Sequence, residues 1–257
     1  MQPYSTTSGH SAPVRKRYPV LDCLRGILLL NMIAYHFLYD WVYIFGQNCT
    51  FMHTRYAFIW QQIICSGFIL LAGCCSTLSR HAAKHGIRIF LCGMLITLVT
   101  TTAAPNEQIL FGILHFTGLA YLITAFLKPW LAKIPTPVFF AAAWILFAFT
   151  RGIYYGYLGV FLHELFPLPD FLYQYPGLFL IGLPSPDFAS ADYFPLIPWL
   201  FLFWTGCSIA PALFKSRWFT RIQHWHLPGL NWIGRRTLVL YMLHQPLVFG
   251  VLWLIFS

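Results

Sequence analysis

The chain has 257 residues, of which 58% are hydrophobic, 19% aromatic and only 9% charged. Soluble domains carry about 25% charged residues, so this composition excludes an ordinary soluble domain. The formal net charge is +9, but the long apolar runs leave no soluble domain to present a basic face, and we expect no nucleic-acid partner.

The apolar runs predict an all-α fold, a polytopic transmembrane helical bundle. The runs are continuous rather than alternating, which argues against a β-barrel. We expect residues 1–14 to form a disordered cytoplasmic tail and residues 15–257 a single integral-membrane domain. About seven spans are predicted, at residues 19–40, 57–79, 87–104, 109–127, 136–150, 194–214 and 237–256.

Charge is distributed asymmetrically between the two sides of this bundle. With the N-terminus inside, every Lys and Arg except Arg25, Arg55 and Arg151 falls on the inner side, and every acid except Asp22 on the outer side. Positive residues mark cytoplasmic segments. The pattern predicts a multi-pass protein of a bacterial inner membrane, with a cytoplasmic N-terminus and an external C-terminus.

Two segments do not have the pattern of a plain span. Residues 151–193 are aromatic but are interrupted by Pro and Gly, which favours an outer cap of re-entrant or interfacial helices. Two additional crossings are the alternative and would leave the orientation unchanged. Residues 215–236 alternate basic and aromatic side chains and predict an interfacial helix on the inner leaflet.

The first span carries four ionisable residues, Asp22, Arg25, His36 and Asp40. At 100° per residue they lie on one stripe of a helix. An ionisable residue inside a span costs roughly 2.5–3.5 kcal/mol and usually faces a bundle interior or a water-filled cavity. The stripe therefore indicates a site, with hydrogen bonding between helices as the alternative.

Within the stripe, His36 and Asp40 are one turn apart. A carboxylate beside an imidazole raises its basicity and fixes its tautomer, as a general base requires. We expect a catalytic group of His36, Asp40 and Arg25, in which Asp40 orients His36. A histidine that only caps the helix is the alternative.

Other polar residues are predicted to line the acceptor side of the same site. His115 lies in the outer half of the fourth span, and proline residues near Asp192 and Tyr193 would loosen the start of the sixth. His244 and Gln245 precede Pro246 near the middle of the last span. Structural roles remain open for all of them: a satisfied core histidine, a helix cap, or compensation of a proline kink.

Basic residues cluster on the predicted inner side, where they could bind the phosphates of acyl-CoA. Topology signalling and lipid contact are the alternative. The residues concerned are Arg80, Lys84, Arg88, Arg235 and Arg236.

No metal site is expected. The pairs His81 and His85, and His224 and His226, have ligand spacing but no acidic or thiol partner nearby. Adjacent Cys74 and Cys75 are expected to pack as small residues rather than to form a disulfide.

Five motifs in order give the chain a family likeness: RYPVLDCLRG with NMIAYHFLYD, then FILLAG, ILFGILHFTGLA, SADYFPLIPW and IGRRTLVLYMLHQP. Over residues 17–252 the chain resembles small bacterial membrane proteins of the heparan-α-glucosaminide N-acetyltransferase catalytic-domain family. It is also similar, more distantly, to the transmembrane acyltransferases that O-acetylate surface glycans, in which an Arg and a His with the spacing of Arg25 and His36 are needed.

The resemblance implies transfer of an acyl group, expected to be acetyl, from cytoplasmic acyl-CoA to an external sugar or glycan. The lysosomal enzyme of the family has its active histidine in the first external loop. The residue nearby here is His53, whose surroundings FMHTRYAFIW depart from that motif, so we expect His36 to be the base or acyl carrier. The expected partners are the bilayer, acyl-CoA and the glycan acceptor, and a homo-oligomer remains open.

A second class of function uses the same polar stripe differently. A proton- or anion-coupled transporter or flippase would also place titratable residues along a span. The sequence contains no evident inverted repeat, which favours the enzyme.

Overall fold

The computed structural model describes residues 17–161 and 163–256. The predicted tail at 1–14 lies outside the described residues. The helices are α1 (Pro19–Tyr39), α2 (Arg55–Ser76), α3 (Ala82–Ala103), α4 (Ile113–Leu131), α5 (Thr136–Phe149), α6 (Leu196–Lys215), α7 (Arg217–Ile222), α8 (Pro228–Arg235) and α9 (Thr237–Phe256).

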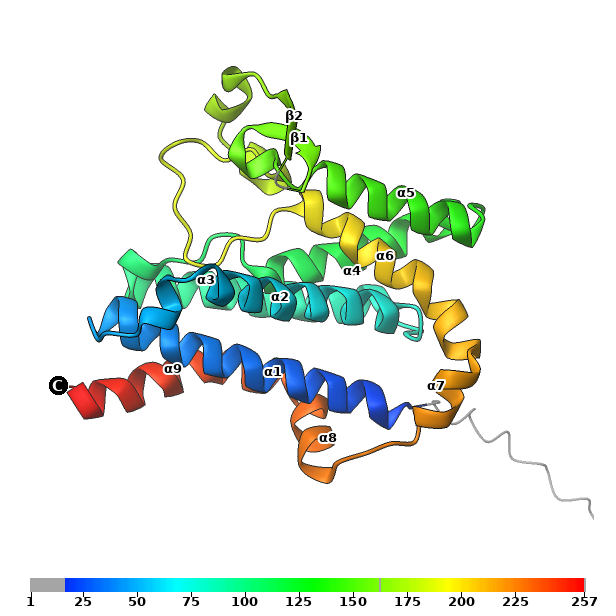
Figure 1. Cartoon of the computed structure of the whole chain (residues 1–257), viewed down its shortest axis with the longest axis horizontal. Helices are drawn as coiled ribbons and strands as arrows, with labels where there is room; N and C mark the ends of the chain where they lie inside the picture. The colour runs from blue at the N-terminus through cyan, green and yellow to red at the C-terminus, as the bar shows by residue number, and fades with distance from the viewer. Residues whose placement is uncertain (1–16, 162, 257) are drawn as a thin grey trace, which may run out of the picture.

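The long helices run side by side along one axis of the molecule (Figure 1). In the described part of the chain, six helices are long and apolar enough to cross a membrane. The predicted all-α polytopic bundle is confirmed, but the expected count of seven is not reproduced by this criterion. The helix that falls short is α4, whose apolar run is interrupted by His115, Lys128 and Pro129, although α4 packs along α3 like the other members of the bundle.

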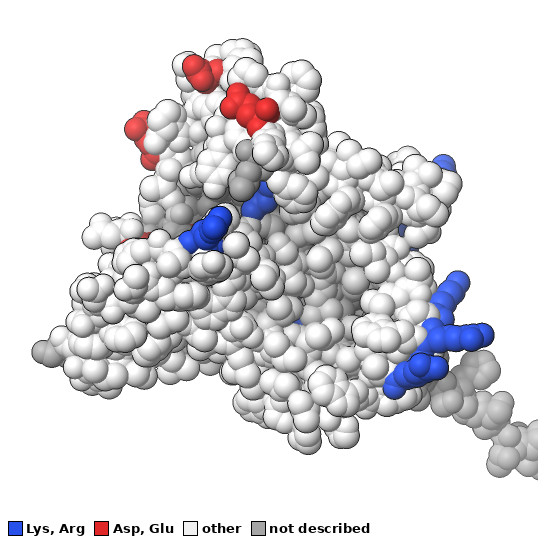
Figure 2. All heavy atoms as spheres, viewed as in Figure 1, with Lys and Arg blue, Asp and Glu red and all other residues white. Residues whose placement is uncertain are grey.

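The two ends of the bundle differ in charge. The described chain starts beside α7 and ends with α9 at the opposite end (Figure 1). Figure 2 shows Lys and Arg gathered at the end where α7 lies, and Asp and Glu over the segment that contains the two strands. These are called below the α7 end and the cap end. The direction in which the bundle crosses the membrane stays a prediction.

Residues 151–195 form the cap, which contains a β-hairpin that the sequence reading did not anticipate. Strand β1 (Tyr157–Val160) pairs antiparallel with β2 (His163–Pro167). The described remainder of the cap contains three 3₁₀ turns, at Ile153–Tyr155, Asp170–Gln174 and Leu178–Ile181, joined by irregular segments. No described part of the cap is a helix long enough to cross a membrane, so the alternative of two additional crossings is wrong, and the predicted re-entrant helices are short turns and strands instead.

The basic segment at 215–236 is two short helices rather than one. Ser216 caps α7 by accepting a hydrogen bond from the backbone N–H of Phe219 at 3.1 Å, and Pro228 starts α8. Helix α8 packs closely against α1, because Gly26 and Gly234 bring the backbones together. The Asn231 amide donates to the carbonyl of Pro19 at 2.7 Å. This packing carries Arg235 to the polar stripe of α1.

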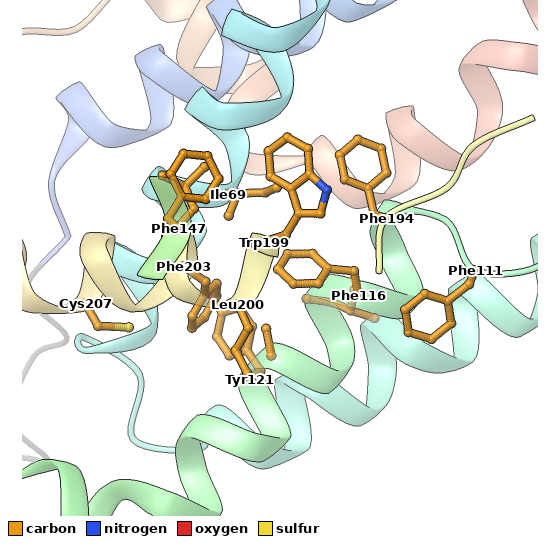
Figure 3. Packing of buried hydrophobic residues seen from close by; sticks show 13 residues of the cluster. Ile69, Phe111, Phe116, Tyr121, Phe147, Phe194, Trp199, Leu200, Phe203 and Cys207 are labelled. Atoms are coloured by element: carbon orange, nitrogen blue, oxygen red, sulfur yellow. The ribbon is translucent and has the colours of Figure 1, made fainter. Parts of the chain in front are cut away.

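The apolar core lies between α2, α4 and α6 and is rich in aromatic side chains (Figure 3). Phe116 and Phe203 are fully buried within it, and Trp199 packs at its cap end. Gly73 and Gly206 let the backbones of α2 and α6 approach each other. The core fixes the α2 and α4 walls of the cavity described next.

Candidate functional site

One cavity of about 310 Å³ lies between α1, α2, α3, α4 and the start of α9. Its volume is at the lower end of the roughly 300–1,000 Å³ found for small-molecule sites. Arg25 and His36, three turns apart on α1, both line it. At 1.5 Å per residue, His36 lies about 16 Å further along the helix than Arg25.

The cavity has apolar walls and polar ends. Its walls come from residues such as Phe68 of α2 and Leu114 of α4. The charged and imidazole side chains of the lining are Arg25, His85 and Arg235 toward the α7 end, and His36 and Asp192 toward the cap end, where Tyr241 also lines the cavity. A ligand lying along α1 would therefore contact guanidinium groups at one end and an imidazole and a carboxylate at the other.

A buried carboxylate organises the α7 end. Only 3% of the Asp22 side chain is exposed, and three guanidinium groups surround it. Arg25 Nη1 donates to Oδ1 at 3.0 Å and Arg17 Nε to Oδ2 at 3.1 Å, while Arg235 Nε lies 3.6 Å from Oδ2. Three positive charges face one negative charge, so the cluster carries an excess positive charge beside the cavity.

At the cap end, two imidazoles face each other across α1 and α9. The ring centres of His36 and His244 are 5.0 Å apart. His244 Nδ1 lies 2.5 Å from the carbonyl oxygen of Tyr241, an arrangement in which Nδ1–H donates. The lone pair is then on Nε2, which is buried and has no partner among the described residues. His36 lines the cavity directly, whereas His244 lies behind it.

Asp40 does not pair with His36 as the spacing suggested. Its carboxylate is fully buried and accepts two hydrogen bonds from the Gln245 amide nitrogen, at 2.9 and 2.8 Å. At Asp40 the α-helix gives way to a π-helical turn, Asp40–Ile44. A spacing of four residues permits a contact within a helix, but here the amide of α9 supplies both donors. The predicted orientation of His36 by Asp40 is therefore corrected.

Asp192 belongs both to the cavity and to the fold. Its Oδ2 accepts a hydrogen bond from the backbone N–H of Ile113 at 3.0 Å, which caps the start of α4, and the carboxylate lines the cavity. Burial raises the pKa of Asp192 to about 6, while the Ile113 hydrogen bond lowers it. A carboxylate with such a pKa changes its charge close to neutral pH.

Four of the five residues predicted for the acceptor side lie outside the cavity lining, namely His115, Tyr193, His244 and Gln245. His115 is buried between α3 and α4, with Nε2 3.2 Å from the Thr97 hydroxyl and its ring stacked on Phe111. The Tyr193 hydroxyl donates to the carbonyl of Phe179 within the cap. Both contacts stabilise the cap end of the fold: His115 packs against α3 and Phe111, and Tyr193 bonds to a cap carbonyl.

Only one of the five predicted phosphate-binding residues lines the cavity, namely Arg235. Arg236 stacks on Trp232, with its guanidinium carbon 4.5 Å from the ring centre. The other three are exposed and absent from the lining: Arg80, Lys84 and Arg88.

Several lining or cluster residues were missed by sequence reasoning. Arg17 was missed, and Asp22 was placed on the polar stripe but given no role, although its spacing of three residues from Arg25 along a helix indicated a pair. His85 was noted only for its spacing from His81, and Tyr241 lies in an otherwise ordinary helical pattern, so neither residue pointed to this cavity. His53 is exposed and lies outside the cavity lining.

Metal ligation has no support in the described residues, since no group of three or more His, Cys, Asp or Glu side chains is arranged to hold an ion. The cavity lining supplies guanidinium, imidazole, carboxylate and hydroxyl groups. Together these can bind an anion, accept a proton and orient a polar substrate.

Comparison with known families gives one match. The sequence model described as "Heparan-alpha-glucosaminide N-acetyltransferase, catalytic" matches residues 17–246, and so covers both ends of the cavity. No curated protein and no solved structure matches the chain. The chain therefore belongs to the heparan-alpha-glucosaminide N-acetyltransferase catalytic family, a family of membrane acetyltransferases.

Proposed function

We propose that the protein transfers an acyl group, most simply acetyl, from cytoplasmic acyl-CoA to a hydroxyl or amine of an external sugar or glycan. In this proposal the α7 end faces the cytoplasm of a bacterial cell and the cap end faces outward. The distribution of charge between the two ends supports that orientation.

The observation that carries the proposal is a single cavity with two chemically different ends. Arg25 and Arg235 line it toward the α7 end, and His36 lines it toward the cap end. An acyl donor bound by its phosphates at the first end would extend its thioester along apolar walls toward the imidazole. The thioester arm of CoA is long and weakly polar, which suits such a passage.

For the donor end, we assign the phosphates to Arg17, Arg25 and Arg235. Guanidinium groups bind phosphate through paired, charge-assisted hydrogen bonds. Asp22 positions them and balances one of their charges. Arg25 and Arg235 line the cavity, and Arg17 joins them through Asp22. Arg80, Lys84, Arg88 and Arg236 neither line the cavity nor pair with Asp22 among the described residues, so they are not part of the proposed donor site.

For the chemical step, His36 acts as the base. It takes the proton of the acceptor hydroxyl or amine, whose oxygen or nitrogen attacks the thioester carbonyl. The carbon–sulfur bond then breaks, and the CoA thiolate takes up the proton, so that acyl-CoA and acceptor become acylated acceptor and CoA. A variant of this route first forms an acyl-imidazole on His36.

Two neighbours assist His36 in this scheme. His244, with its ring centre 5.0 Å away, can share the proton. Asp192, which lines the same cavity, orients the acceptor. Asp40 acts indirectly, by holding Gln245 beside His244.

The test is transfer of labelled acetyl from acetyl-CoA to a mixed pool of sugars by purified protein in detergent. His36→Ala should abolish transfer while thermal unfolding stays close to wild type, because His36 lines a cavity and is not in the core. His53→Ala is the matched control and should keep full activity. Full turnover by a folded His36→Ala protein would contradict the mechanism.

The same preparation distinguishes the transporter. Acetyl-CoA should raise the thermal unfolding temperature of the enzyme. Proton-coupled uptake of solute into liposomes without CoA, and no stabilisation by acetyl-CoA, would favour transport instead.

A further inference from the structure

Arg151 is held at the cap end by contacts that leave most of its hydrogen-bond donors unused. Its guanidinium carbon lies 4.5 Å from the ring centre of Trp199 and 5.9 Å from that of Phe147. One Nη2 hydrogen donates to the side-chain oxygen of Gln62. A guanidinium has five N–H donors. The contact with Gln62 uses one of them, and the other four have no hydrogen-bond acceptor among the described residues.

This guanidinium lies next to the cap end of the cavity. The Trp199 ring beneath it packs on Phe194, with ring centres 5.1 Å apart, and Phe194 lines the cavity together with Asp192. Gln62 lies one helical turn before Cys65, which is another lining residue. By either route two side chains lie between Arg151 and the cavity, so Arg151 borders the cap end of the space in which the acceptor would react without lining it.

The surroundings make this positive charge distinctive. Figure 2 shows a recess between the cap and the bundle, with Lys and Arg side chains in it, below a cap surface on which Asp and Glu gather. An acidic surface disfavours anionic molecules in general. The guanidinium of Arg151 is stacked on Trp199 at this end of the molecule. A stacked guanidinium with free donors would reverse that preference locally, since stacking holds the planar group ready for two parallel hydrogen bonds.

We propose that Arg151 is the anion-binding group of the acceptor site, so that the preferred acceptor carries a carboxylate or a phosphate close to the group that is acylated. The inference rests on the proposed function and adds the chemical class of the acceptor to it. A different role would be purely structural, with Arg151 fastening the cap to α2 through Gln62.

Equilibrium binding without the donor tests this directly. Three related sugars serve as probes: glucosamine, muramic acid with a carboxylate, and glucosamine 6-phosphate. The wild-type protein should bind one or both anionic sugars about tenfold or more tightly than glucosamine, as a charge-assisted pair predicts. The preferred probe tells whether carboxylate or phosphate is recognised.

Variants separate recognition from structure. Arg151→Gln should reduce the preference for anionic sugars to about twofold or less, and Arg151→Lys should keep part of it, because the charge remains but the paired donors are lost. The matched control is Arg55→Gln, an exposed arginine two turns before Gln62 on α2, which should leave the preference unchanged. Thermal unfolding of each variant monitors folding.

Two results would overturn the inference. One is a wild-type protein that binds glucosamine as tightly as both anionic sugars, and the other is an Arg151→Gln protein that weakens all three sugars equally. Binding that depends on Arg151, without any acetyl transfer from acetyl-CoA, would refute the proposed function and leave this inference standing. Acetyl transfer without any preference for anionic acceptors would support the proposed function and refute this inference.

Discussion

Replacing Arg235 by Gln should weaken acetyl-CoA binding much more than it lowers the free energy of unfolding. Arg235 Nε is 3.6 Å from the Asp22 carboxylate, beyond hydrogen-bond distance, and 49% of its side chain is exposed. A pair of this kind contributes roughly 0–1 kcal/mol to the free energy of unfolding. A charge-assisted hydrogen bond to a bound phosphate contributes roughly 1.5–3 kcal/mol. Arg235→Gln should therefore weaken acetyl-CoA binding by about 10- to 150-fold and lower stability by less than about 1 kcal/mol.

The assay is acetyl-CoA binding by calorimetry, with thermal unfolding of the same preparations. Arg236→Gln is a stringent control, since Arg236 is the next residue, carries the same charge and stacks on Trp232 outside the cavity lining. It should change donor affinity by less than about threefold, the size of a screened long-range effect. Equal loss of affinity in the two variants would show that the basic end acts only through its overall charge, and would refute the assignment of Arg235 to the donor phosphates.

Three further predictions concern other parts of the site. The folded pKa of Asp192 is raised from 3.8 to about 6, so the folded protein binds this proton more tightly than the unfolded chain does. The free energy of unfolding should therefore fall as the pH rises from about 4 to 6. Asp192→Asn should flatten that dependence in unfolding experiments. Gln245→Leu leaves the buried carboxylate of Asp40 without its donor and should cost about 1–3 kcal/mol, measured by denaturation in detergent; an unchanged midpoint would mean that water replaces the amide. Gly234→Ala places a methyl group against the backbone of α1, and should lower the free energy of unfolding by about 1–3 kcal/mol and weaken acetyl-CoA binding. Gly229→Ala, on the same helix, places its methyl group in open space and should change neither quantity.

The bundle was predictable because membrane spans have a strong local signal. Length and apolarity alone define a span, and six of the predicted spans meet that criterion in the described chain. The β-hairpin at Tyr157–Pro167 was missed because its strands are four and five residues long, too short for an alternating pattern to stand out among aromatic residues. The break between α7 and α8 follows from Pro228, a helix-start signal that we did not weigh.

The site was predictable only where its residues share one helix. Arg25 and His36 line the same cavity, as helical periodicity suggested. Contacts between helices were not predictable: Asp40 meets Gln245, 205 residues away, rather than the neighbouring His36. Helical spacing limits which side chains face the same way, but tertiary packing decides which partner each one meets.

The most direct measurement is a structure of the protein with CoA bound. We predict that the phosphates contact Arg25 and Arg235, that the pantetheine arm lies along the cavity beside α1, and that the sulfur reaches the His36 imidazole within about one hydrogen-bond or water-bridged distance. Phosphates bound instead at Arg80, Lys84 and Arg88, with the sulfur outside the cavity, would contradict a single passage linking the basic end of the bundle to His36.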